Sequence, residues 1–185
     1  MFVRAMIRRE ADFVKLEWVF DSAFRFFPTE PDAECGWKLN FFDAATNKVL
    51  ALVGRVMARD FVDIIQLHRH HLSFGTLCWA ASAKDVGLNP FFILGEARRT
   101  THYTKDDFEA VELVQPLDLP ALYQTWRQAV ADAETLLGKL PAEEVGCLYL
   151  NDQNIPVTPD PTSPDFAKLR RHFGTVRGAW PVIRE

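Results

Sequence analysis

The stretch that decides the fold reads Asp43-Ala-Ala-Thr-Asn-Lys48-Val-Leu-Ala-Leu-Val-Gly-Arg55-Val-Met-Ala-Arg59-Asp60-Phe-Val-Asp63-Ile-Ile65. Apolar side chains recur in it at helical spacing, which predicts a helix packed on a core. They are Val49, Leu50, Leu52, Val53, Val56 and Met57. Asp43 stands where an N-cap residue would accept backbone N–H bonds. Gly54 and the break near Ala58 leave two helices as compatible with the pattern as one.

The same stretch carries charged residues inside its apolar pattern. In one continuous helix Lys48, Arg55 and Arg59 would lie within roughly 20° of a common line, and Asp63 within about 60°. Such cations can hold phosphate, and a nearby carboxylate can orient a cation or accept a proton. The other interpretation is an ion-pair network that joins two helices, with Arg59 paired to Asp60 or Asp63 and no ligand.

This stretch resembles the lysine motif and the following Arg-Asp-x-x-Asp motif of the AbiEii-type nucleotidyltransferases, the toxins of bacterial type IV toxin–antitoxin pairs and their relatives. Asn-Lys, Ala-Leu, Gly-Arg and Arg-Asp-Phe-Val-Asp follow in the family's order. The resemblance implies transfer of a nucleotide from an NTP, with Mg²⁺, to an RNA or protein acceptor, for some relatives the 3′ end of tRNA. Lys48 would hold phosphate, Asp60 or Asp63 would position Lys48 or activate the attacking hydroxyl, and Arg55 and Arg59 would bind substrate. An antitoxin protein is the implied partner.

Upstream, residues 2–7 and 13–20 alternate in polarity and predict two strands of a hairpin joined by a charged turn. Glu17 lies on the second strand, which looks central in a sheet. By the resemblance, Glu17 would help to hold Mg²⁺. The alternative is a solvated acid on an edge strand.

Two motifs of the family are missing from the sequence: a Gly-Gly or Gly-Ser turn and an Asp-x-Asp pair that follows it. None of the nine glycines precedes Gly or Ser, and we interpret Glu10-Ala-Asp12 and Asp132-Ala-Glu134 as accidental. The sequence therefore predicts the latter half or two-thirds of a nucleotidyltransferase, inactive as this chain alone. The alternatives are a truncated gene start, or a non-catalytic binding or antitoxin-interacting regulatory protein without cofactors.

The predicted fold class is α+β, with a remnant of a nucleotidyltransferase sheet followed by a mainly helical region. Residues 1–42 would form the partial sheet and a loop, and 43–140 the helical region. Residues 141–185 would form a small hairpin, a Pro-rich linker and a helix near 164–173. The predicted helices are 43–57, 59–70, 72–83, 89–101, 104–113 and 119–138, with caps at Asn89-Pro90 and Thr104.

Composition bounds the function classes. A net charge of −4 argues against a protein that binds nucleic acid over a generally basic surface, although residues 165–185 are locally basic and 104–145 locally acidic.

Three widely spaced cysteines favour reduced thiols in a cytoplasm and no structural zinc. The histidines at 68, 70 and 71 have no carboxylate or Cys at ligand spacing. No stretch is apolar and long enough to predict a membrane span, and the sequence does not fix the oligomeric state.

Overall fold

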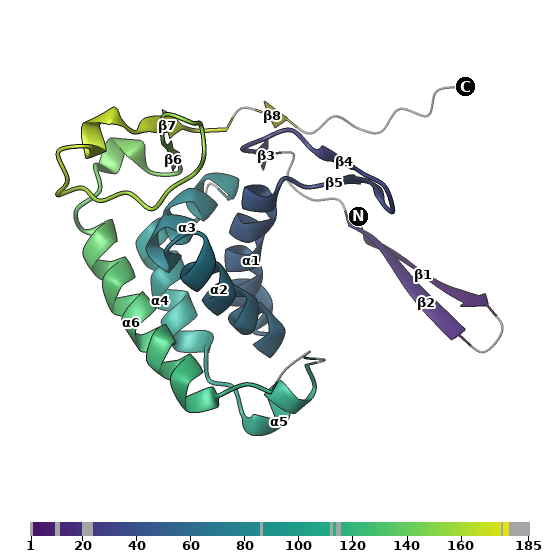
Figure 1. Ribbon diagram of the computed structural model, residues 1–185. Helices are drawn as coiled ribbons and strands as arrows, with labels where there is room; N and C mark the ends of the chain where they lie inside the picture. Colours follow the sequence, from purple (N-terminus) through teal and green to yellow (C-terminus); the bar gives the residue numbers. More distant parts are fainter. Residues whose placement is uncertain are drawn as a thin grey trace, which may run out of the picture.

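The computed structural model describes residues 2–9, 12–19, 24–85, 87–111, 113, 116–174 and 176–177. Within them the protein is α+β, with a helical body and short antiparallel strand pairs at its margin (Figure 1). The helices are α1 (Phe41–Arg55), α2 (Ala58–His70), α3 (Phe74–Ala81), α4 (Pro90–Thr100), α5 (Lys105–Glu109) and α6 (Leu119–Leu137). The strands are β1 (Phe2–Arg9), β2 (Asp12–Val19), β3 (Phe24–Arg25), β4 (Glu30–Asp32), β5 (Gly36–Lys38), β6 (Leu148–Leu150), β7 (Arg170–His172) and β8 (Val176–Arg177).

Most helix starts follow from local capping. The predicted caps are confirmed: Asn89 accepts from the backbone N–H of Phe92, and Thr104 forms a capping box with Asp107. The predicted N-cap at Asp43 is wrong. Asn40 caps α1 through its side chain, and Asp43 lies inside the first turn.

The core surrounds α3, all of whose residues are buried. Gly75 in α3 permits a close approach of α6, since an added Cβ would lie 2.9 Å from the Cα of Ala133. The predicted apolar stripe of α6 is confirmed as its buried face, which consists of Leu122, Trp126, Ala129, Val130, Ala133 and Leu137. The helical region predicted for residues 43–140 is thus the body of the molecule.

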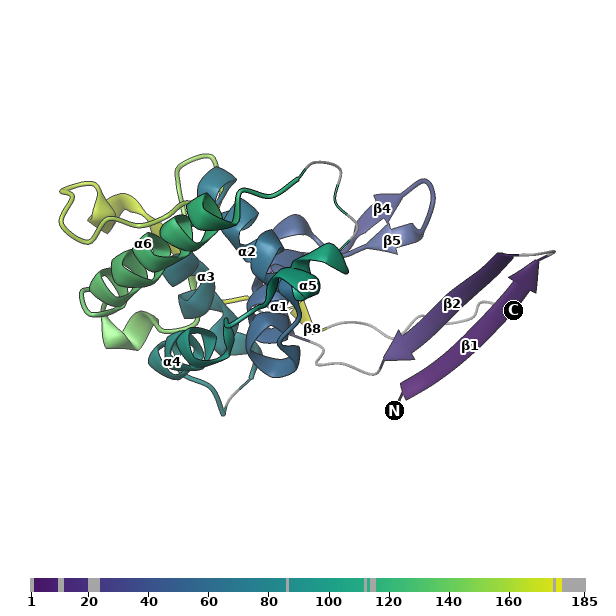
Figure 2. The ribbon, with the colours of Figure 1, turned by 90° about the horizontal axis from the view of Figure 1, so that it is seen from below.

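The strands β1 and β2 form the predicted hairpin, in a register that pairs Phe2 with Val19 and Arg9 with Asp12. They form a sheet of two strands, which stands away from the helical body (Figures 1 and 2). The prediction that Glu17 lies on a central strand is therefore wrong. Among the described residues, each strand of this hairpin has one hydrogen-bonded neighbour strand.

The predicted turn near residues 151–154 is confirmed, because Leu150 bridges Pro156 and the Asn151 side chain accepts two backbone N–H bonds. The predicted helix near 164–173 is wrong. Its place is taken by a 3₁₀ turn at Phe166–Lys168 and by β7, which pairs with β6. The pairing partner lies about 20 residues upstream, so helical spacing within the segment carries no signal of it. Residues 178–185, part of the predicted basic tail, lie outside the described chain.

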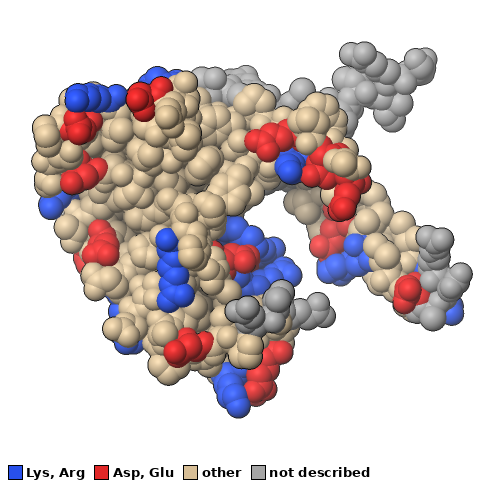
Figure 3. Space-filling view, viewed as in Figure 1, with Lys and Arg blue, Asp and Glu red and all other residues tan. Residues whose placement is uncertain are grey.

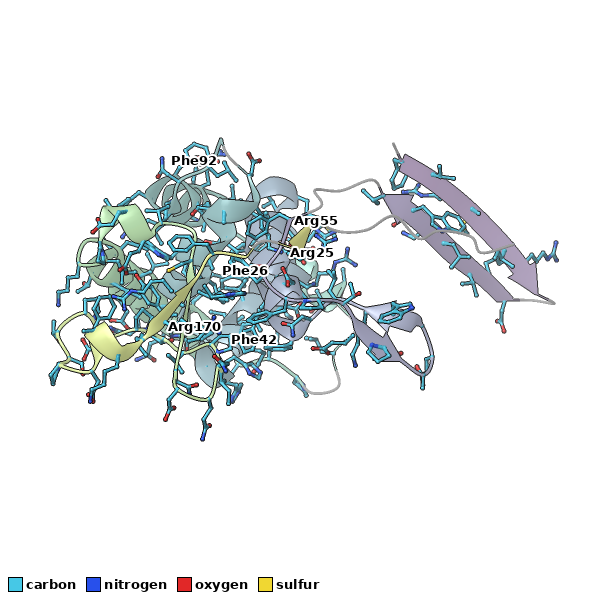
Figure 4. The ribbon with its side chains drawn as sticks, turned by 90° about the horizontal axis from the view of Figure 1, so that it is seen from above. Arg25, Phe26, Phe42, Arg55, Phe92 and Arg170 are labelled. Carbon is cyan, nitrogen blue, oxygen red and sulfur yellow. The ribbon has the colours of Figure 1, made fainter. Side chains whose placement is uncertain are left out.

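Residues 24–27 meet residues 172 and 176–177, which are far from them in the sequence, beside α1. The buried Asp43 carboxylate accepts the backbone N–H groups of Phe26 and Phe27 and pairs with buried Lys84 at 2.8 Å. His172 Nε2 donates to the Phe26 carbonyl at 2.6 Å. Nearby, β3 pairs with β8. Figure 4 shows Phe26 inside the body, next to α1.

Candidate functional site

A sharp joint separates α1 from α2 and places the charged motif. Val56 adopts a left-handed conformation, with φ 48° and ψ 56°, directly after Arg55. A β-branched residue rarely adopts this conformation, which costs about 1–2 kcal/mol for an L-residue. The joint ends α1 and starts α2 at Ala58, so two helices form where the pattern allowed one or two.

Asp60, in the first turn of α2, is the anchor of the site. Its side chain is fully buried and accepts from Arg55 Nε at 2.8 Å and from Arg55 Nη2 at 3.0 Å. Lys48 Nζ donates to the same carboxylate at 3.0 Å. Burial tends to raise the pKa of Asp60, but the hydrogen bonds from Arg55 and Lys48 outweigh burial and hold that pKa below its ordinary value.

Lys48 connects Asp60 with Asp63. Its Nζ lies 2.6 Å from Asp63 Oδ2, and its side chain is 34% exposed. Burial tends to lower the pKa of Lys48, but the bonds to Asp63 and Asp60 raise it above its ordinary value. Lys48 is therefore protonated across the physiological range. The structure thus brings four of the predicted site residues together: Lys48, Arg55, Asp60 and Asp63.

Two hollows flank this network. One, of about 520 Å³, lies along α1 and is lined by Leu39, Ala44, Asn47, Lys48, Leu50, Ala51, Gly54 and Arg55. The other, of about 340 Å³, lies between α1 and α2, and Lys48 and Asp63 line it together with His70 and His71. Lys48 belongs to both. Figure 3 shows basic and acidic side chains side by side in the concave region between the body and the hairpin, and Figure 4 shows Arg55 on that side.

Arg59 does not take the place predicted for it in the network. Its side chain is exposed and forms no hydrogen bond or ion pair within the described chain. Arg55 pairs with Asp60 instead. The left-handed joint at Val56 explains why Arg55, and not Arg59, pairs with Asp60. The joint brings the end of α1 next to the first turn of α2.

Glu17 is not brought to Lys48. It pairs with Arg4 at 2.8 Å and with Lys15 at 3.4 Å on the hairpin. The hairpin projects away from the body (Figure 2). The cleft that Glu17, Lys48 and the motif aspartates were expected to share is therefore not formed.

Sequence reasoning missed Tyr103, which lies between α4 and α5. Its hydroxyl is buried without a hydrogen-bond partner in the described part of the chain. Burial, and next the charge of Asp60, raise the pKa of Tyr103 to about 12. No motif marks this tyrosine, since it reaches the Asp60 environment only through packing of the ring on Phe61.

The described residues contain no group of three or more His, Cys, Asp or Glu side chains arranged to hold a metal ion. His68 Nδ1 accepts the backbone N–H of Phe74, which ties the end of α2 to the start of α3. Among the described helices, none is long and apolar enough to cross a membrane.

Comparisons with protein-family models, with curated proteins and with solved structures found no match to this chain. The resemblance to the AbiEii-type nucleotidyltransferases therefore stays a prediction carried by the motif residues, and the function is argued from the geometry of the site.

Proposed function

We propose that Lys48 and Arg55 bind the phosphates of a nucleotide, as the anion-binding half of a nucleotidyltransferase-like centre, and that this chain alone transfers no nucleotide. The motif resemblance supports the substrate class, an NTP, and an RNA or protein acceptor such as tRNA. The proposed setting is cytoplasmic, with an antitoxin protein as a regulatory partner.

The observation that carries the proposal is that two cations share one buried acceptor. Lys48 Nζ and Arg55 Nη2 each lie 3.0 Å from Asp60 Oδ1, so they are at most about 6 Å apart. A phosphate group fits between two donors at that separation. The Asp60 side chain is buried, whereas the side chains of Lys48 and Arg55 are 34% and 51% exposed. The carboxylate therefore holds both cations from the protein interior, and their solvent-facing N–H groups are left to bind a ligand.

Asp63 has a different role in this proposal. Its side chain is 47% exposed and bonded to Lys48, so it competes with an incoming phosphate for the same ammonium group. An arriving phosphate displaces it, and the freed carboxylate is then placed to accept a proton from an attacking hydroxyl. Asp60 stays in place as the positioning residue.

The three carboxylates predicted for the site do not fit a Mg²⁺ site. Asp60 is bonded by Arg55 and Lys48, Asp63 by Lys48, and Glu17 by Arg4 and Lys15. Phosphoryl transfer with two metals needs several unoccupied carboxylate oxygens in one place. We therefore assign no step of the reaction to a metal held by these residues.

Calorimetric titration with ATP, at low and at moderate salt, tests the binding site. We expect binding that weakens with salt and falls about tenfold in Lys48→Ala, the cost of roughly one charged phosphate contact. Lys105→Ala is the matched control, because Lys105 also pairs with a carboxylate, Glu109 at 3.3 Å, but on α5. Asp63→Asn should bind ATP more tightly, since it releases Lys48.

Equal ATP affinity in Lys48→Ala and Lys105→Ala would show that the network only joins α1 to α2. Incubation with Mg²⁺, labelled NTPs and total tRNA tests the second half of the proposal, and we expect no label transfer. Transfer that depends on Lys48 would contradict it and would make Glu10 and Asp12 the first residues to test as replacement acids.

A second candidate function is a non-catalytic partner-binding protein. It is favoured by the apolar face of the β1–β2 hairpin, on which Ile7, Val14 and Trp18 are each about half exposed. In that case the network around Asp60 serves stability alone, and the hairpin carries the function.

A further inference from the structure

The β1–β2 hairpin has one apolar face and one face that mixes charged and apolar side chains. Cross-strand partners point to the same side of an antiparallel pair, so the register sorts the side chains. Val3 pairs with Trp18, Ala5 with Leu16 and Ile7 with Val14. These six residues form the apolar face, and Ile7, Val14 and Trp18 are about half exposed (48%, 53% and 55%).

The opposite face has a different chemistry. Arg4 and Glu17 form an ion pair at its centre, and Arg4 and Arg8 lie over the rings of Phe2 and Phe13. Phe2, Met6, Phe13 and Val19 lie on the same face, where they alternate with the charged side chains. The apolar face needs a cover, because a two-stranded hairpin alone is only marginally stable and gains stability when a hydrophobic face packs on another element.

We propose that the apolar face docks on the α1 hollow of a second copy of this chain, and that the two copies exchange their hairpins reciprocally. The hollow along α1 is lined mainly by small or apolar residues, Leu39, Ala44, Leu50, Ala51 and Gly54, and its polar residues are Asn47, Lys48 and Arg55. α1 has 15 residues and is about 22 Å long, close to the roughly 27 Å of an eight-residue strand. The hairpin projects from the body on the side of α1, the helix along which the hollow lies (Figure 1).

The buried surface area favours reciprocal docking of the two hairpins over direct stacking of one hairpin on the other. A hairpin about 27 Å long and about 10 Å wide covers roughly 270 Å², and docking removes that area from both surfaces, about 540 Å² in all. Two hairpins stacked on each other bury only this amount. Reciprocal docking buries twice as much, about 1,100 Å², which exceeds the roughly 1,000 Å² that a biological interface should bury.

Sedimentation equilibrium without nucleotide tests the proposal. We expect a dimer in the wild type and a dissociation constant raised at least about tenfold in Ile7→Asp, which places a charge on the apolar face. Met6→Asp is the matched control: Met6 is the adjacent residue, is 60% exposed and lies on the opposite face, so the dimer should persist. Ala51→Glu, in the α1 hollow, should dissociate the dimer as Ile7→Asp does.

A mixture of the Ile7→Asp and Ala51→Glu variants tests whether the hairpin of one copy docks on the hollow of the other. The Ala51→Glu copy has an intact hairpin and the Ile7→Asp copy an intact hollow, so the mixture should form a heterodimer through one good contact, although neither variant dimerises alone. A monomeric wild type at about 200 µM, equal damage by Met6→Asp and Ile7→Asp, or no rescue in the mixture would each overturn the proposal. Unchanged thermal melts would confirm that the body remains folded in every variant.

The dimerisation test does not depend on ATP binding, because it is made without nucleotide and with Lys48 and Arg55 intact. Nucleotide binding and hairpin docking are proposed for the same hollow. Lys48 and Arg55 line the same hollow, so a docked hairpin and a bound phosphate compete for it.

Discussion

Replacing Arg55 with alanine tests which arginine holds the network. The change removes two of the three side-chain hydrogen bonds that Asp60 accepts, those of 2.8 and 3.0 Å, and leaves only the bond from Lys48. A hydrogen bond to a charged group contributes about 1.5–3 kcal/mol, and a buried carboxylate left underpaired adds to the loss. Because the Arg55 side chain is 51% exposed, solvent screening reduces that sum.

We therefore expect Arg55→Ala to lower the free energy of unfolding by about 2 kcal/mol, equivalent to about 4–8 °C in Tm for a chain of this size. Arg59→Ala should change it by less than about 0.5 kcal/mol, since Arg59 is exposed and makes no side-chain bond within the described chain. Urea melts of the two variants and the wild type measure both values. Equal losses in the two variants, or a loss below about 0.5 kcal/mol in Arg55→Ala, would refute this account of the joint.

Three further outcomes are expected. Burial opposes ionisation of Asp60, yet its bonds to Arg55 and Lys48 keep its folded pKa low, so the unfolded chain takes up this proton first. That stabilisation is complete above about pH 5 and is lost as pH falls through the folded pKa; urea melts should show a shallower acid limb in Asp60→Asn. Val56→Gly should raise the free energy of unfolding by about 0.5–1 kcal/mol by relieving the left-handed joint, and a loss in urea melts would contradict this. A thiol reagent should label one cysteine in the native protein, exposed Cys35, and all three in urea, because the other two are buried.

The helices were predictable because their signals are local. The stripe of α6 and the cap at Asn89 each lie within one element, and the structure confirms both. Asp43 was misassigned because its partners are distant in sequence: Phe26 lies 17 residues before it and Lys84 41 residues after it. No periodicity within a helix encodes such a contact.

The site was predictable only in part. Helical spacing placed Lys48 near Arg55 and Asp63, and the motif resemblance added Asp60; the structure brings these four residues together. The choice of Arg55 over Arg59 depends on a left-handed conformation at Val56, and valine gives no sequence signal for it. Alternation predicted the strand that carries Glu17, but alternation does not encode how a hairpin sits relative to helices.

The contact between Phe26 and His172 has a consequence for the order in which the protein is made. The two residues are 146 positions apart, so at about 5–20 residues per second a ribosome needs roughly 7–30 s between them. Through most of that time the Phe26 carbonyl lacks the donor that will eventually satisfy it. Asp43 and Lys84 are synthesised much earlier and can hold the segment against α1 in the meantime. The Asp43–Lys84 ion pair can therefore form before the Phe26–His172 contact, and both are present in the folded protein.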